Sequence, residues 1–154
     1  TTEIYTLSLH DALPIFIFIG SFISSYHKEK FKESQQEFMP YYSLIVITLK
    51  ADSALLQKTR ILLERYPDLE VIIVQADGSK ECPASWSSRL CLAQAPKGRG
   101  LQCNAGARLA SGENLIFLHA DTELPQKAFE VIDKVFQDPK VQLACFRLRF
   151  DMAH

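Results

Sequence analysis

Apolar runs and amphipathic segments alternate along the chain from residue 42 onward. The segments SLIVITL (43–49), EVIIVQA (70–76) and NLIFLHA (114–120) are continuous runs of mostly branched or aromatic apolar residues. Such runs are typical of strands that are buried on both faces of a sheet. RLCLAQA (89–95) is a shorter candidate strand. VQLACFRLRF (141–150) ends with apolar residues alternating with arginines, which indicates one solvent-facing side.

Helices are predicted between these strands. Asp52 or Ser53 can cap the first helix, which ends at Pro67 and Asp68 and has an apolar side formed by Leu55, Leu56, Thr59, Leu62 and Leu63. The second helix spans residues 101–111, opens after a glycine loop and stops at Gly112. Pro125 suits the first turn of a third helix that runs to about Phe136.

This order of strands and helices predicts an α/β fold with a mostly parallel sheet, flanked by helices and connected by right-handed crossovers. Ligands of such sheets bind beyond the carboxyl ends of the strands. The loops 50–52, 76–82 and 119–123 follow three of the predicted strands. We therefore expect the functional site at these loops.

The N-terminal segment is interpreted separately. Residues 1–15 (TTEIYTLSLHDALPI) resemble the translation of a sequencing-library adapter, so we treat them as an artefact without a role in the fold. We expect a truncated gene fragment, with residues 16–41 as a linker or truncated upstream segment and residues 42–154 as the domain. The apolar stretch 16–23 allows a buried strand or helix, out-of-frame sequence, or the end of a membrane helix with a basic flank.

Composition narrows the class of protein. The chain is 47% hydrophobic and 23% charged, which is typical of a globular domain. Its 17 basic and 18 acidic residues lack the positive excess of a nucleic-acid binder. Four cysteines without zinc-ligand spacing argue against a structural zinc site and a disulfide scaffold and favour a reducing compartment. We expect a cytoplasmic protein, with association at the inner face of the membrane as the alternative.

The glycine-rich segment KGRGLQCNAGARLASG (97–112) places Arg99, Gln102 and Asn104 around the start of the second helix. Backbone N–H groups at a helix N-terminus favour anions such as a diphosphate, and Arg99 can add a bidentate phosphate contact. Asp77, in the turn after the second strand, can hydrogen-bond a base or ribose. The simpler alternatives are a glycine-flanked amphipathic helix and an ordinary Asp-Gly-Ser turn.

A second pair of polar residues follows the strand 114–120. His119 and Asp121 are two positions apart where the chain leaves the strand, so both can face one divalent cation. A carboxylate suits Mg²⁺ or Mn²⁺, and the imidazole favours Mn²⁺. The alternative is that Asp121 or Thr122 caps the helix that Pro125 enters.

Together these motifs resemble glycosyltransferase family 2, whose members have the Rossmann-like GT-A fold. The similarity rests on residues 98–107 (GRGLQCNAGA) and 117–125 (FLHADTELP) and extends over residues 43–151. The similarity is greatest to a bacterial branch described as radical-SAM-associated transferases. Residues 146–151 (FRLRFD) resemble the next strand of that branch.

This resemblance implies metal-assisted transfer of a sugar from a nucleotide-sugar donor to an unknown acceptor. It places His119 and Asp121 at the family's metal-binding D-x-D motif. The resemblance also implies that Asp77 lies at the nucleoside pocket. The residues that it places beside the donor are Arg99, Gln102 and Asn104.

The chain departs from the family pattern after its first two strands. Lys50 and Ala51 stand where the family usually has Asn-Glu, and Ala76 replaces the aspartate that normally contacts the base. The family's acidic general base is expected beyond His154, so no catalytic residue is assigned and the isolated fragment is expected to be inactive. One alternative is a degenerate GT-A-like domain that binds a nucleotide, lipid or partner without transferring sugar. The other, a nucleotidyltransferase, would need glycines that residues 49–56 lack.

Overall fold

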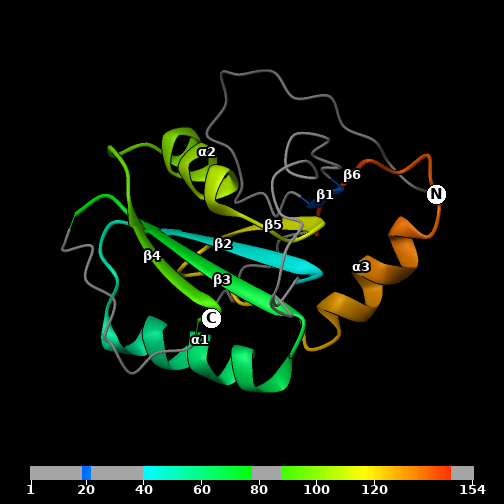
Figure 1. The fold of residues 1–154 in the computed structure, drawn as a ribbon, viewed down its shortest axis with the longest axis horizontal. Coiled ribbons are helices and arrows are strands. Elements are labelled where there is room, and N and C mark those ends of the chain that lie inside the picture. The colour runs from blue at the N-terminus through cyan, green and yellow to red at the C-terminus, as the bar shows by residue number, and fades with distance from the viewer. Residues whose placement is uncertain (1–18, 22–39, 78–87, 147–154) are drawn as a thin grey trace, which may run out of the picture.

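The continuous apolar runs become the central strands of a sheet. The computed structural model describes residues 19–21, 40–77 and 88–146. In it, β2 (Tyr42–Thr48) pairs in parallel with β3 (Leu69–Gln75) on one side and β5 (Asn114–His119) on the other. β4 (Leu90–Gln94) adds a fourth parallel strand beside β3. The predicted α/β fold with a mostly parallel sheet is confirmed (Figure 1).

The order of the strands creates a switch point. Across the described residues, the sheet runs β4-β3-β2-β5-β1-β6. From β2 the chain proceeds outward through β3 to β4 and then returns to β5, on the opposite side of β2. The strand order therefore reverses between β2 and β5, and ligands of open α/β sheets bind beyond the carboxyl ends of the strands at such a point.

Two short strands extend the sheet beyond β5. β1 (Ile19–Ser21) is antiparallel to both β5 and β6 (Leu143–Ala144). Residues 19–21 therefore form a strand, one of the alternatives for the apolar stretch 16–23, whose other residues lie outside the described ranges. β6 is shorter than the predicted strand 141–150 because its partner β1 has only three residues; residues 147–150 also lie outside those ranges.

The helices begin and end for identifiable reasons. α1 (Ser53–Arg65) starts at Asp52, whose carboxylate accepts a hydrogen bond from the Leu55 N–H at 2.8 Å, as predicted. At its other end, the Arg89 guanidinium donates to the carbonyl oxygens of Leu63 at 2.7 Å and Tyr66 at 2.9 Å.

The other two helices differ from their predicted ranges. α2 (Arg99–Leu109) begins and ends two residues earlier, because the Gly98 carbonyl already accepts the Gln102 N–H. α3 (Ala128–Phe136) begins three residues later, since Pro125 lies in the preceding turn. Among the helices of the described part, none is long and apolar enough to span a bilayer.

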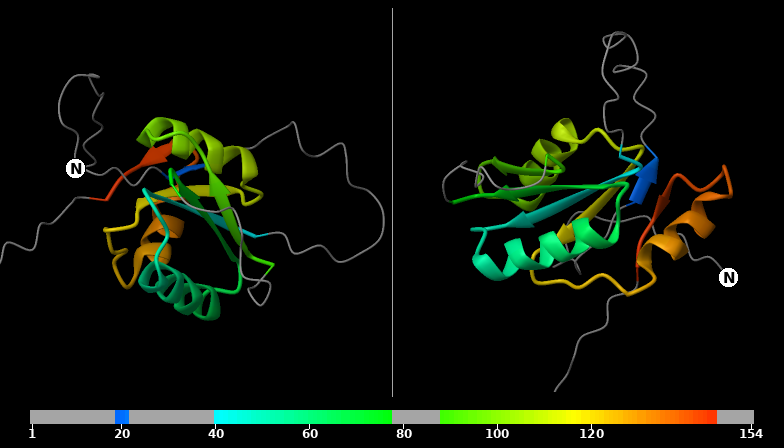
Figure 2. Two further views of the ribbon diagram at one scale, coloured as in Figure 1. Left: turned by 90° about the vertical axis from the view of Figure 1, so that its left-hand side faces the viewer. Right: turned by 60° about the horizontal axis from the view of Figure 1, so that its bottom comes forward.

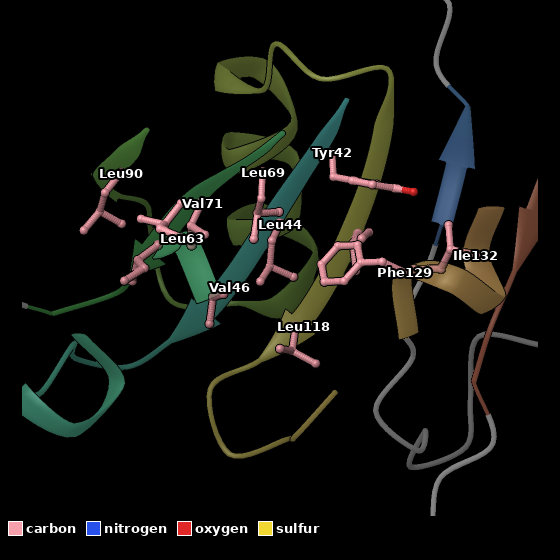
Figure 3. Packing of buried hydrophobic residues seen from close by; sticks show 12 residues of the cluster. Tyr42, Leu44, Val46, Leu63, Leu69, Val71, Leu90, Leu118, Phe129 and Ile132 are labelled. Carbon is pink, nitrogen blue, oxygen red and sulfur yellow. The ribbon is translucent and has the colours of Figure 1, made fainter. Parts of the chain in front are cut away.

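Helices cover both faces of the sheet, as the two views of Figure 2 show. α1 and α3 pack on one face over a large apolar cluster that includes Leu44, Val71 and Phe129 (Figure 3). α2 packs on the other face over a smaller cluster, formed by Ile45, Ile47, Ile72, Val74 and Ala95. This two-sided burial explains why the middle residues of the central strands are apolar without alternation.

Candidate functional site

The start of α2 and the end of β5 meet at the same strand end. The Gln102 side-chain amide donates to the Thr48 carbonyl oxygen at 2.6 Å, and the Ala120 N–H donates to the Ile47 carbonyl oxygen at 3.1 Å. Both acceptors belong to the last two residues of β2. The two motifs that sequence analysis singled out therefore lie together at the switch point.

His119 is the last residue of β5 and is half-buried beside Ile47 of β2. Burial and the nearby Arg99 guanidinium lower the pKa of the imidazole, while Asp121 acts in the opposite direction. A lowered pKa favours the neutral imidazole, which is the form that ligates a metal ion.

Asp121 projects from the turn after β5 and is exposed. Its Oδ1 atom accepts a hydrogen bond from the Thr122 hydroxyl at 3.3 Å. The residue preceding α3 is Lys127, and no side chain caps this helix. The alternative in which Asp121 or Thr122 caps the third helix is therefore wrong.

The donor set at this end of β5 fits a divalent cation that is shared with a ligand. Among the described residues, no group of three or more His, Cys, Asp or Glu side chains could hold a metal ion. His119 and Asp121 offer one imidazole and one carboxylate. Mg²⁺ and similar ions often bind through one or two carboxylates and complete their coordination with waters and phosphate oxygens. A site with two protein ligands thus suits a phosphorylated substrate better than a structural metal.

Positive charge gathers at the start of α2. Arg99 is the first residue of the helix and is exposed, as is Lys97 before it. Gly98 precedes the helix with φ of 149°, a conformation that L side chains rarely adopt, and the first turn contains no acidic residue. The helix N-terminus and Arg99 together favour a bound anion.

Gln102 and Asn104 lie in different environments. Gln102 is buried against the sheet and donates to the Thr48 carbonyl and, at 2.9 Å, to the Val74 carbonyl. Asn104 is exposed. Because a helix has 3.6 residues per turn, a residue two positions after Gln102 lies on the opposite side of α2. The structure therefore does not bring these two predicted donor-binding residues together.

Asp77 lies just beyond β3 and is exposed. Its N–H donates to the Leu49 carbonyl oxygen at 2.7 Å, which holds it beside the end of β2. Gly78 and Ser79, the rest of the predicted Asp-Gly-Ser turn, are outside the described residues.

No role was predicted for Gln75, the last residue of β3. It is buried, and its Oε1 atom accepts a hydrogen bond from the Ala51 N–H at 3.0 Å. This bond joins the loop after β2 to the end of β3. The available signal was a polar residue near the end of the otherwise apolar run 70–76.

Comparison with models of protein families matches residues 43–152 to the model described as Glycosyl transferase family 2. The match includes β3, β4 and β5, all but the first residue of β2, and the three helices of the described residues. No curated protein and no solved structure matches the chain.

Proposed function

Because the chain belongs to glycosyl transferase family 2, and so in general terms to the glycosyltransferases, we propose that it binds a nucleotide-sugar donor at the switch point and transfers the sugar to an acceptor with the help of Mg²⁺ or Mn²⁺. The two long motifs around Arg99 and His119 support a place within the radical-SAM-associated branch of the family.

One observation supports this proposal most strongly. The first turn of α2 and the turn after β5 both hydrogen-bond to the last two residues of β2. Arg99 and Asp121 therefore flank one strand end, where a diphosphate can contact the guanidinium and a cation held by the carboxylate at once. Such an arrangement is expected of a donor site in an open α/β sheet.

We assign roles from these positions. His119 and Asp121 would hold the divalent cation, which when bound would neutralise negative charge on the diphosphate leaving group. Arg99 would bind the same diphosphate through charge-assisted hydrogen bonds. Asp77, held beside Leu49, would contact the nucleoside. Asn104, on the outward side of α2, would contact the donor only where it extends past the helix.

Metal-dependent nucleotide binding tests the proposal. We expect the full chain to bind UDP or GDP in isothermal titration calorimetry, more tightly with Mn²⁺ than with EDTA. Asp121→Ala should abolish the metal-dependent part, whereas Asp68→Ala, which removes an exposed carboxylate from the turn before β3, should leave it unchanged. Absence of binding to either nucleotide in Mn²⁺ would contradict the proposed donor site.

A second candidate function is nucleotide binding without sugar transfer. It is favoured by Ala76, which offers no side-chain group to a base and whose N–H points back to the Thr48 and Leu49 carbonyls. Under this alternative, metal-dependent UDP or GDP binding persists, but the corresponding nucleotide sugars bind no differently from the nucleotides. A preference for one nucleotide sugar over its nucleotide would favour transfer.

A further inference from the structure

α2 lacks the apolar anchors that usually fix a helix on a sheet. Of its eleven residues, only Gln102 and Gly106 are buried, whereas Leu101 and Leu109 are 54% and 51% exposed. The helix presents small residues to the sheet, and burial of small side chains contributes little stabilisation. The alternative of a glycine-flanked amphipathic helix therefore lacks the large apolar side chains it would need on the buried side. The position of α2 must depend on other contacts.

Polar contacts fix the far end of α2. The Glu70 carboxylate accepts hydrogen bonds from the Ser111 N–H at 2.6 Å and the Ser111 hydroxyl at 2.9 Å. Ser43 donates to the same carboxylate and accepts the Gly112 N–H at 2.8 Å. A Cβ at Gly112 would lie 2.6 Å from the Ser43 Oγ atom, so the chain passes very close to β2 here.

Gln102 fixes the end of α2 that faces the switch point. Its side chain is 5% exposed, and its single amide nitrogen donates to carbonyl oxygens of two neighbouring strands, Thr48 of β2 and Val74 of β3. Its own N–H closes the first turn of the helix onto Gly98. One side chain thus joins the helix start to both strand ends.

The geometry suits a neutral amide at this buried position. A primary amide has two N–H groups on one nitrogen and can donate to two acceptors at once. A glutamate would present acceptors to two carbonyl oxygens, and an apolar side chain would leave both carbonyls without these donors. Gln75 adds a second amide at the same edge by accepting the Ala51 N–H, so the loop after β2 is held as well.

From these contacts we propose that Gln102 is a positioning residue of the donor site. It sets the location of Arg99, one helical turn away, relative to His119 and Asp121, and it acts through α2 and the end of β2 without touching the donor. This role rests on the proposed function, because it presupposes that a diphosphate binds between these elements.

The test compares nucleotide binding in two matched variants of the full chain. Gln102→Met keeps the length of the side chain and removes both donors, and Gln57→Met makes the same change at an exposed position of α1. With UDP or GDP and Mn²⁺, below the unfolding temperature of each variant, we expect Gln102→Met to bind about tenfold or more weakly and Gln57→Met to bind normally. Circular dichroism checks that each variant is folded; if Gln102→Met does not fold, Gln102→Leu replaces it.

A double-mutant cycle with Arg99→Ala separates positioning from general stability. If Gln102 acts through Arg99, then Gln102→Met should weaken binding much less in the Arg99→Ala background than in the unsubstituted chain. Equal effects in both backgrounds, or unchanged binding in Gln102→Met, would overturn the positioning role while leaving the donor site intact. If the unsubstituted chain binds neither nucleotide, the proposed function fails, and the positioning role fails with it.

Discussion

Gly106 should be the position on α2 that tolerates a side chain least. A Cβ placed there would lie 2.3 Å from the Ile45 Cγ2 atom and 3.1 Å from the Val74 Cγ2 atom. Ordinary contacts between carbon atoms are about 3.5–4.0 Å, so the helix or Ile45 would have to move by more than about 1 Å. Ile45 is fully buried and branched at Cβ, which restricts its side-chain rotation.

Gly106→Ala therefore combines two opposing effects. Alanine favours the helical state over glycine by about 1 kcal/mol. Overpacking a close-packed core costs about 1–3 kcal/mol, and an outward shift of α2 would instead stretch the two Gln102 hydrogen bonds, each contributing about 1 kcal/mol. The difference between these effects is an expected net loss of up to about 2 kcal/mol in the free energy of unfolding.

Gly100→Ala is the matched control in the same helix. A Cβ at Gly100 would meet nothing within 4 Å. The free energy of unfolding of this variant should rise by about 0.4–1 kcal/mol, because alanine has fewer backbone conformations than glycine to lose on folding. Urea unfolding followed by circular dichroism measures both variants, with the slope against urea as a check that the transition is unchanged. If Gly106→Ala proves as stable as Gly100→Ala, α2 does not lie against the sheet as described.

Three further predictions follow from individual contacts. Arg99→Ala should weaken UDP binding about tenfold or more, because charge-assisted hydrogen bonds contribute about 1.5–3 kcal/mol, and should weaken uridine binding less than twofold. Calorimetry measures both affinities, and equal losses would remove Arg99 from the phosphate site. Glu70→Ala should lower the free energy of unfolding by about 2 kcal/mol, because it leaves donors at Ser111 without their acceptor, and a change near zero in urea unfolding would contradict this. Iodoacetamide at pH 8 should alkylate Cys103 more slowly than the exposed Cys145, because burial raises the pKa of the Cys103 thiol and leaves less thiolate. The alkylation rate of Cys103 should keep rising at higher pH. Peptide mass spectrometry measures both rates, and faster labelling of Cys103 would refute its burial.

Local sequence signals predicted the elements well where the cause is local. Continuous branched runs indicated the central strands, and the carboxylate of Asp52, one of the two predicted capping residues, caps α1. The start of α2 lies two residues before its predicted position, because the Gly98 carbonyl already accepts the Gln102 N–H, and α3 starts three residues late, because Pro125 lies in the preceding turn. For the site, the sequence indicated the loops after β2, β3 and β5, and the structure brings these strand ends to one edge of the sheet.

Only the tertiary structure decided which of these residues meet. The order of the strands along the chain does not determine their order in the sheet. The position of β5 beside β2, and with it the meeting of the start of α2 and the turn after β5 at the end of β2, follows from packing. The orientation of α2 likewise turned Gln102 toward two carbonyls and Asn104 toward solvent, although both belong to one motif. Hydrophobic periodicity specifies which segments are buried, whereas hydrogen-bond partners far apart in sequence are chosen when those segments pack.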